Sequence, residues 1–443
     1  MTRVAIIGGG VTGLAAGMAS GGTVFEAAAG PGGICSSYYV RPGATERLAE
    51  RPLDEMAYRF EVGGGHWIFG GRPEVLDLID ELSPMVVHER RASVHFAASG
   101  YTVPYPFQDH VAGLDADLAA RAASERGAGA SPAAVMPVMP VTPVTPVTPV
   151  TPVPVLTMAD WLRARFGPSL CERFFDPFHE RYTAGLHREL APQDSYKSPT
   201  GQPGYNVTFR YPPAGLDTVV RAMAHRCDVR FGTRVVGIDP QVRQLRLADG
   251  TIEAYERLLC TLPLDATLEL CGIDPGGLGR PDPHTSVIVV NVGGTRGPAC
   301  PDGHWVYEPE SAAGFHRYGI YSNVDPSFVP GGDASRVALY VEHAVRAGER
   351  PGAVDEATLV AATVAELVAR GVVADVEVVD VSWVPVAYTW SWPGSTWVAD
   401  ALGALDQIGV EQVGRYARWH FQGIAESIAD GLDAGARLAL TAP

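Results

Sequence analysis

The stretch Val4-Ala-Ile-Ile-Gly-Gly-Gly-Val-Thr-Gly-Leu14 decides the fold of this 443-residue chain. An apolar run that predicts a β-strand ends in Gly8-x-Gly10-x-x-Gly13 and leads directly into a helical pattern over 11–20. Such glycines make a tight turn and let the backbone approach a pyrophosphate, which the N-terminus of the helix then binds. The stretch therefore predicts the opening β-turn-α unit of a dinucleotide-binding fold.

The residues that follow strengthen this prediction. A second apolar run, Thr23-Val-Phe25, ends in Glu26, and Gly32-Gly33 comes soon after it. An acidic residue about 20 positions beyond the glycines is where such folds bind a ribose hydroxyl. The glycines alone also fit an ordinary turn, but the ordered set of strand, glycines, helix, strand and acid favours dinucleotide binding.

Composition narrows the class of protein. The formal net charge is −16, and no basic run is present, so we expect no nucleic-acid partner. Of the 34 basic residues only Lys197 is a lysine, which we interpret as a compositional bias toward arginine. The six cysteines have no metal-binding spacing, and no apolar run approaches the roughly 20 residues of a membrane helix. We expect a cytoplasmic protein with free thiols, no metal site, no signal peptide and no membrane contact.

The pattern along the chain predicts an α/β fold with a discontinuous Rossmann-type domain. Residues 1–70, 205–265 and 395–443 are expected to form that domain, and a mixed α+β substrate domain is inserted into it. Its first part, 71–204, is predicted to be mainly helical, and 266–394 to be rich in β-strands. A Val-Thr-Pro repeat over 132–155 favours polyproline II. We interpret the repeat as a surface insertion rather than a docking segment for a proline-binding partner.

Particular elements are predicted within this outline. Helices are expected over 72–82, over 356–370 and over 422–435, and two more between 157 and 195. Strands are expected over 286–294, 314–322, 336–345 and 376–386. Asp249-Gly250 is a hairpin turn signal.

Glu26-x5-Gly32-Gly33 resembles the pattern of FAD-binding proteins of the glutathione-reductase type. The resemblance implies FAD as cofactor. It also implies that the flavin lies between a second glycine-rich segment and a C-terminal Gly-Arg. The implied FAD-binding residues are Gly8, Gly10, Gly13, Glu26, Gly32, Gly33, Gly64, Gly65, His66, Val235, Gly414 and Arg415.

The whole chain resembles the amine oxidase and protoporphyrinogen oxidase superfamily. Within it, the chain looks most like the UDP-galactopyranose mutases, especially the longer eukaryotic-like type. The segments that carry this resemblance follow one another in the same order as in that family. They are Gly64–Phe69, Val103–Gln108, Asn206–Gly215, Trp305–Glu310, Phe315–Asn323, Val386–Tyr388 and Gly414–Trp419.

In those mutases the reduced flavin N5 attacks the anomeric carbon of a nucleotide sugar and displaces the nucleotide diphosphate. The sugar changes ring size without net redox, and NAD(P)H is a possible reductant. The resemblance implies that Arg317 holds the diphosphate, with hydrogen bonds from Tyr307, Tyr388 and Asn206, and that His66 lies beside the flavin. The implied contacts to the rest of the substrate are Tyr105, Phe107, Gln108, His179 and Phe421.

The chain departs from the mutase pattern at the sugar-nucleotide site. Thr183 stands where the family has a tryptophan that stacks on uracil, and Arg181 stands in place of a lysine. Lys197 is the nearest match to a second catalytic arginine, and a lysine does not reproduce the bidentate contact of an arginine. Phe421 stands where a tyrosine hydroxyl is expected. These changes predict a nucleotide sugar other than UDP-galactose.

Two other interpretations remain open from the sequence. An FAD-dependent oxidase or dehydrogenase can use the same scaffold, with Lys197 near the flavin N5, because fold does not fix function. A flavin-binding protein without turnover is the third. Arg317, Tyr388 and His66 also have structural interpretations, as a strand arginine, a core aromatic residue and a hydrogen-bonded loop histidine. The substrate and the oligomeric state stay open.

Overall fold

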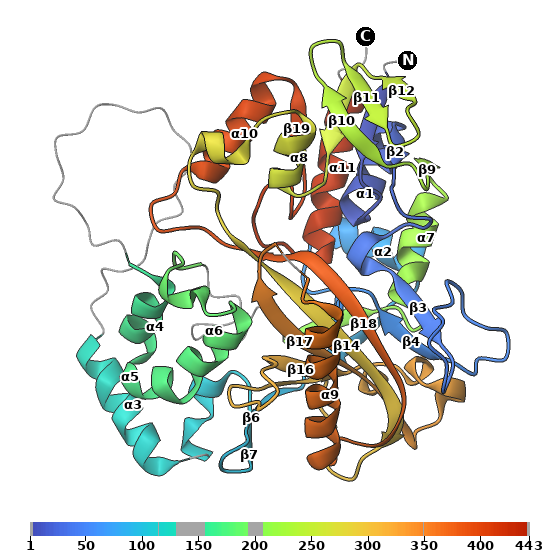
Figure 1. Cartoon of the computed structure of the whole chain (residues 1–443). Helices are drawn as coiled ribbons and strands as arrows, with labels where there is room; N and C mark the ends of the chain where they lie inside the picture. Colours follow the sequence, from blue (N-terminus) through green and yellow to red (C-terminus); the bar gives the residue numbers. More distant parts are fainter. Residues whose placement is uncertain (1–2, 114, 130–155, 194–206, 349, 441–443) are drawn as a thin grey trace, which may run out of the picture.

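A computed structural model describes residues 3–113, 115–129, 156–193, 207–348 and 350–440. Figure 1 shows an upper lobe that contains both ends of the chain, a lower lobe built around a large sheet, and a group of helices beside the lower lobe. The Val-Thr-Pro repeat, Lys197 and Asn206 lie outside the described residues.

The upper lobe contains a five-stranded parallel sheet in the order β19-β13-β1-β2-β9. The predicted opening unit is confirmed as β1 (Val4–Ile7), α1 (Val11–Ser20) and β2 (Thr23–Phe25). The middle of the chain adds two strands, β9 (Asp228–Arg230) and β13 (Arg257–Cys260), and the C-terminal part adds β19 (Val410–Gln412). One sheet thus unites three distant stretches of sequence.

The last helix, α11 (Ile424–Leu440), packs directly against α1, because the side of α11 that faces α1 has glycines. A Cβ atom at Gly431 would lie 2.2 Å from the Thr12 carbonyl oxygen, and one at Gly435 would lie 2.5 Å from the Ala16 carbonyl oxygen. The two backbones therefore meet without intervening side chains. This contact joins the C-terminal helix to the glycine turn at the start of the chain.

A three-stranded antiparallel sheet covers one end of this lobe. It consists of β10 (Val235–Asp239), β11 (Gln244–Leu247) and β12 (Ile252–Ala254), and the turn predicted at Asp249-Gly250 joins the last two strands. Its apolar side packs with α8 (Leu264–Leu270) and α10 (Trp397–Gln407). The helices α2 (Pro73–Leu82) and α7 (Leu216–Ala224) lie below, next to the short β3 (Ser37–Val40) and β4 (Tyr58–Glu61).

The lower lobe is a seven-stranded sheet in the order β18-β14-β17-β16-β15-β6-β7. Its long central strands are β14 (His284–Arg296), β17 (Arg336–Arg346) and β18 (Val373–Thr389), followed by β15 (Trp305–Tyr307) and β16 (Arg317–Ile320). The predicted strands are confirmed here, although β18 is longer than expected and β16 is shorter than the predicted 314–322. Along β14, Ile288 and Val290 face α9 (Ala353–Ala369), whereas Val287 and Val289 face the main core.

Residues 86–104 differ from the mainly helical prediction for 71–204. They form β5 (Val86–Glu89), β6 (Ala92–Phe96) and β7 (Tyr101–Pro104). β6 pairs with β15, and β5 pairs with β8 (Thr208–Tyr211). Two residues of β6, Val94 and Phe96, and one of β7, Val103, are buried. Strands as short as these give no clear alternating pattern in the sequence.

The helical part of this segment comes later in the sequence. It contains α3 (Ala116–Gly129), α4 (Met158–Phe166), α5 (Pro168–Leu170) and α6 (Asp176–Tyr182), with a π-helical stretch over Cys171–Phe175 between the last two. The predicted pair of helices between 157 and 195 is confirmed. Figure 1 shows this group beside the lower lobe.

The α1–α11 contact gives a stability prediction. Replacing Gly431→Ala puts a methyl group 2.2 Å from the Thr12 carbonyl oxygen, and such overpacking costs about 1–3 kcal/mol. We expect a lower midpoint in urea unfolding followed by circular dichroism. Gly403→Ala in α10 is the matched control, because nothing lies within 4 Å of a Cβ atom there. An equal midpoint in both variants would contradict close helix contact.

Candidate active site

The turn between β1 and α1 has two glycines that cannot be replaced and a third that borders open space. Gly8 has φ +102°, and a Cβ atom at Gly13 would lie 1.9 Å from the Gly8 carbonyl oxygen. At Gly10, by contrast, a Cβ atom would meet nothing within 4 Å. Gly10 also precedes α1 without a side-chain cap, so the helix N-terminus faces open space. Free N–H groups at a helix N-terminus bind phosphate well.

Glu26 and the second glycine pair brace this turn. The Glu26 carboxylate accepts hydrogen bonds from the amides of Gly9 (2.6 Å) and Ala28 (2.7 Å). Gly32 donates to the Gly9 carbonyl at 2.8 Å, and Gly33 lies against Gly10. Val235 is buried in the adjacent core cluster of the small antiparallel sheet. The predicted residues of the dinucleotide end are therefore gathered around one turn.

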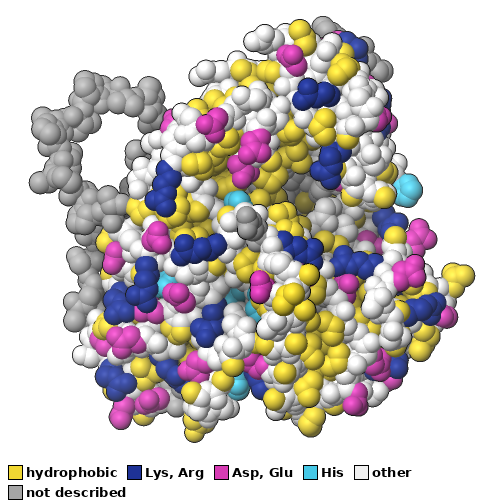
Figure 2. All heavy atoms as spheres, viewed as in Figure 1, with side chains coloured by type: hydrophobic (Ala, Val, Ile, Leu, Met, Phe, Trp, Pro, Cys, Tyr) yellow, Lys and Arg dark blue, Asp and Glu magenta, His cyan; other side chains and the backbone are white. Residues whose placement is uncertain are grey.

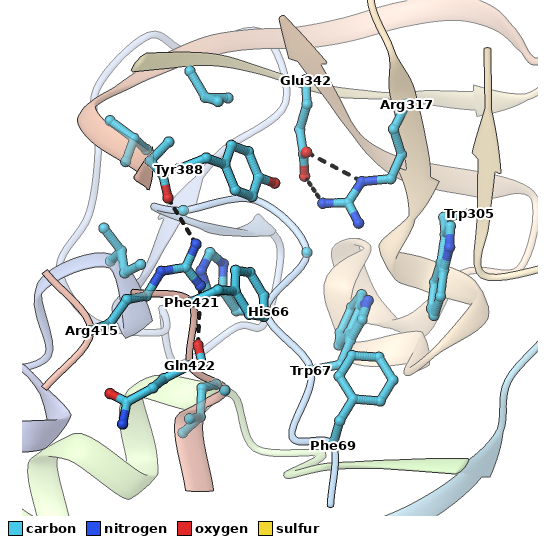
Figure 3. Close-up of a pocket in the computed structure, with 18 of the residues that line it drawn as sticks. His66, Trp67, Phe69, Trp305, Arg317, Glu342, Tyr388, Arg415, Phe421 and Gln422 are labelled. Atoms are coloured by element: carbon cyan, nitrogen blue, oxygen red, sulfur yellow. Dashed lines mark hydrogen bonds and ion pairs between the residues drawn. The ribbon is translucent and has the colours of Figure 1, made fainter. Parts of the chain in front are cut away.

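A cavity that is partly open to solvent lies between the two lobes, and its empty space, open solvent included, is about 980 Å³. Figure 2 shows the molecule hollowed between the lobes, with basic side chains along the lower rim of the hollow. Figure 3 shows how the segment after β4, the strands of the lower sheet and the segment before α11 each contribute side chains to its wall. Predicted site residues that line it are Gly65, His66, Tyr105, Tyr307, Arg317, Tyr388, Arg415 and Phe421.

The second glycine-rich segment turns sharply at the cavity wall. Gly64 has φ +79°, and a Cβ atom at Gly65 would lie 2.2 Å from the Tyr340 hydroxyl oxygen. The His66 Nδ1–H donates to the Gly64 carbonyl at 3.3 Å. Burial lowers the pKa of His66 to about 4, so the imidazole is neutral at pH 7.

Arg415 of the C-terminal Gly-Arg also lines the cavity. Gly414 has φ +90° and approaches the Thr12 side chain of α1. Arg415 donates to the carbonyl oxygens of Ala387 (2.8 Å) and Gln422 (3.1 Å), as Figure 3 shows. Its buried Nε has no hydrogen-bond partner among the described residues. A donor is thus available for a ligand beside α1.

A buried ion pair forms the opposite wall. Arg317 and Glu342 face each other across β16 and β17, and the Arg317 Nε donates to Glu342 Oε2 at 3.2 Å. A second hydrogen bond joins Arg317 Nη2 to Glu342 Oε1, and the His316 Nε2–H donates to Glu342 Oε2 at 3.2 Å. Burial opposes the charge of Arg317, but Glu342 raises its pKa well above the ordinary value. Arg317 is therefore held in one position as a cation.

Aromatic side chains complete the cavity. The rings of Tyr105 and Tyr307 lie 4.5 Å apart, and Trp67, Phe69 and Trp305 form the wall nearby. The Tyr388 ring points toward the Arg317–Glu342 pair in Figure 3. Burial raises the pKa of Tyr388, so its hydroxyl stays protonated and can donate a hydrogen bond. The site combines fixed cations, hydroxyl donors and flat apolar surfaces.

Three predicted substrate contacts are not among the described residues that line the cavity. Phe107 is fully buried between Phe96 and Phe174, whose ring centres lie 5.3 and 5.1 Å away. Gln108 is 6% exposed and His179 is 4% exposed. The His179 Nδ1–H donates to a backbone carbonyl one helical turn earlier, at 2.7 Å. Their contact with a substrate stays a prediction.

Thr183 and Arg181, which stand in or next to α6 where the mutases have other residues, form hydrogen bonds within the protein. The Thr183 hydroxyl donates to the His179 carbonyl at 2.7 Å, and the side chain is fully buried. Arg181 donates to the carbonyls of Pro177 (3.0 Å) and Ser311 (3.2 Å). Neither lines the cavity. Lys197 and Asn206, the remaining predicted site residues, lie outside the described residues.

Two charged residues of the cavity were not predicted. Glu342 directly follows the apolar run Val337–Val341, and a single carboxylate in such a strand is a signal that sequence reasoning can use. Arg90 also lines the cavity, but nothing distinguishes it in sequence from its neighbour Arg91. Only the folded structure shows that Arg90 lines the cavity and Arg91 does not.

The comparisons with known proteins agree with this geometry. A family model described as flavin containing amine oxidoreductase matches residues 22–289. The chain belongs to the flavin-containing amine oxidoreductase family. A comparison with curated proteins found no match.

Solved structures with this fold include proteins of different activity. A reduced UDP-galactopyranose mutase has a TM-score of 0.81 at 20% identity, covering 100% of this chain and 94% of that one. A putative protoporphyrinogen oxidase from Exiguobacterium sp. 255-15 has a TM-score of 0.67 at 16% identity, with 100% and 99% covered. A putrescine oxidase bound to putrescine has a TM-score of 0.60 at 16% identity, with 99% of each chain covered. At these identities the likeness shows the fold alone.

The chain is thus a flavin-dependent enzyme of the amine oxidase superfamily, and its residues fit FAD. The open space at Gly10 suits a pyrophosphate at the N-terminus of α1, and the unpartnered Arg415 Nε suits an acceptor on the flavin ring. No helix among the described residues is long and apolar enough to cross a membrane. Nor do those residues bring together three or more histidine, cysteine or acidic side chains as a metal would need.

The fit at Gly10 gives a direct prediction. Gly10→Ala adds a methyl group that the protein itself accommodates, because nothing lies within 4 Å. If the pyrophosphate occupies that space, the variant keeps the stability of the apoprotein but binds FAD at least about tenfold more weakly, since the methyl blocks close backbone approach. Fluorescence titration of apoprotein with FAD measures this, with Gly403→Ala as control. Unchanged affinity for FAD in Gly10→Ala would place the pyrophosphate elsewhere.

Proposed function

We propose that this protein is an FAD-dependent nucleotide-sugar mutase, which interconverts the pyranose and furanose forms of a nucleotide-diphosphate sugar without net redox. The observation that carries the proposal is the charge of the cavity. Among the described residues, Arg90, Arg317 and Arg415 line it with a single carboxylate, Glu342, which leaves two formal positive charges there in a chain whose net charge is −16. A cavity of this charge suits an anionic substrate such as a nucleotide diphosphate.

The arginine–glutamate pair gives the cation a fixed place. When the bond between the anomeric carbon and the diphosphate breaks, negative charge develops on the diphosphate. Preorganised hydrogen-bond donors in a partly dry site stabilise such charge well. Arg317 is held by Glu342, so it loses little side-chain freedom when the diphosphate arrives. Tyr307 and Tyr388 line the same cavity and supply hydroxyl donors. In this proposal these three side chains hold the leaving group until the sugar has changed ring size.

The reduced flavin, when bound, supplies the nucleophile for the anomeric carbon. The protein supports this from the other wall of the cavity. His66 is neutral and adds no charge beside the cofactor, and Trp67 and Phe69 shield the reacting atoms from water. Arg415, whose guanidinium is anchored on two backbone carbonyls, would hold the flavin through its remaining donor, Nε.

The substrate in this proposal is not UDP-galactose. Thr183 is buried in a hydrogen bond to its own helix and offers no aromatic surface for a base. Losing such a stacking contact costs about 1–3 kcal/mol where it has been measured for other base–aromatic pairs. In this proposal the rings of Tyr105 and Tyr307, which line the cavity, offer an aromatic surface to the base instead.

An FAD-dependent oxidoreductase is the second candidate, and family membership favours it. It would oxidise a small molecule held between the aromatic side chains Trp67, Phe69 and Trp305. The two candidates differ in one measurable property. The oxidoreductase passes electrons from its substrate to the flavin, whereas the mutase returns its flavin unchanged.

The experiment is an anaerobic assay on a panel of UDP- and dTDP-sugars, with the flavin either oxidised or reduced by dithionite. We expect conversion only with reduced flavin, to a product of unchanged mass. Bleaching of the oxidised flavin by an amine or another small molecule, without any sugar conversion, would instead support the oxidoreductase.

Variants of Arg317 test the role of the cation. We expect Arg317→Ala to lower kcat/KM at least about hundredfold, in the range seen for lost charge-stabilising donors, while FAD content is kept. Because this variant leaves Glu342 buried without its cation, the double variant Arg317→Met, Glu342→Gln controls for instability. Full activity in either variant would contradict the proposed role of Arg317.

A further inference from the structure

The three cavity arginines are not equally available to a ligand. Arg317 is committed to the Glu342 carboxylate, and Arg415 donates to two backbone carbonyls. The Arg90 guanidinium has no hydrogen bond or ion pair within the described residues, and the side chain is half-buried in the cavity wall. Among the described residues all five N–H donors of this guanidinium stay available, and such a group binds an oxyanion strongly.

The backbone holds Arg90 firmly on both sides. Its amide donates to the Val207 carbonyl at 2.8 Å, which continues the pairing of β5 with β8. The next amide, that of Arg91, donates to His304 Nδ1 at 3.1 Å, and β6 begins at Ala92. Arg90 is therefore presented from a short, fixed connection between two strands.

The position of Arg90 relative to Arg317 suits an extended anion. The Arg90 guanidinium lies over the Tyr105 ring, 5.5 Å from its centre, and the Tyr105 ring packs on Tyr307 at 4.5 Å. Tyr307 in turn faces Arg317 in the β15–β16 pair. The two tyrosines thus link one arginine that is free to bind and one that is already neutralised.

We propose that Arg90 binds the diphosphate of the substrate together with Arg317, as the second cation of the site. This inference rests on the proposed function, since it assigns a residue to the diphosphate of that substrate. Charge supports it. A dianionic ligand beside the neutral Arg317–Glu342 pair also meets the Glu342 carboxylate, so a second cation is needed to balance its charge. Arg90 is the cavity arginine without a partner of its own in the described part of the chain.

The test measures binding rather than turnover. Protein loaded with oxidised FAD is titrated calorimetrically with UDP, uridine and pyrophosphate. The variants are Arg90→Ala, Arg90→Lys and Arg91→Ala. Arg91 is the matched control, because it has the same side chain at the adjacent position but is exposed and does not line the cavity.

We expect Arg90→Ala to weaken UDP and pyrophosphate binding by about ten- to a hundredfold, the range for a lost hydrogen bond to a charged group. Its affinity for uridine should equal that of the wild type, and Arg91→Ala should bind all three ligands as the wild type does. Arg90→Lys should fall between, because an ammonium keeps the charge but not the planar fork.

Several outcomes would overturn the proposal. Unchanged UDP affinity in Arg90→Ala would reject the role of Arg90 and leave the mutase proposal standing. An equal loss of uridine and UDP affinity would show that Arg90 acts on the nucleoside or on the fold instead. Pyrophosphate binding that depends on Arg90, in a protein that does not bind UDP, would keep the oxyanion site and reject the nucleotide sugar. No binding of any of the three ligands by the wild type would reject both.

Discussion

The close contact between α1 and α11 is the constraint on which the cofactor end of the structure depends. Glycines at 431 and 435 let the two helix backbones touch, and Gly414 lies against Thr12 of α1 in the same region. As a result, the C-terminal Gly414-Arg415 is placed beside the turn formed by Gly8–Gly13. Two parts of the chain separated by about four hundred residues in sequence therefore form one binding surface. A side chain at either helix glycine would move that surface apart.

Charge distribution inside the cavity matters more than the charge of the whole protein. An acidic chain is compatible with an anionic ligand because local arginines set the potential where the ligand binds. Arg317 and Glu342 are both almost fully buried, and such a pair contributes geometry rather than much stability, since desolvation offsets its attraction. The pair fixes one guanidinium, and Arg90 leaves another available. In the proposed function, this arrangement forms an anion site within a chain whose net charge is −16.

The sequence predicts the β1-α1-β2 unit well and the side-chain contacts of the cavity less well. The β1-α1-β2 unit was predictable because its glycines, apolar runs and Glu26 lie within one short stretch. The Arg317–Glu342 pair depends on strand register between residues 25 positions apart, and Arg90 differs from Arg91 only through the packing of β5 and β6. Phe107 and His179, which were expected to contact a ligand, are buried, and that contact stays a prediction. Resemblance to a family indicates which residue types to expect, whereas tertiary contacts decide which way they point.

The central claim is that the bond between the anomeric carbon and the diphosphate oxygen breaks and re-forms in this cavity. The most direct measurement uses a nucleotide sugar labelled with ¹⁸O at that bridging oxygen, incubated anaerobically with the enzyme and followed by ³¹P nuclear magnetic resonance. With reduced flavin, we predict that the label spreads to the non-bridging oxygens of the same phosphate, because a free phosphate group can rotate before recapture. With oxidised flavin the label should stay in place. A label that stays bridging in both states, for the nucleotide sugar that binds most tightly, would contradict the account.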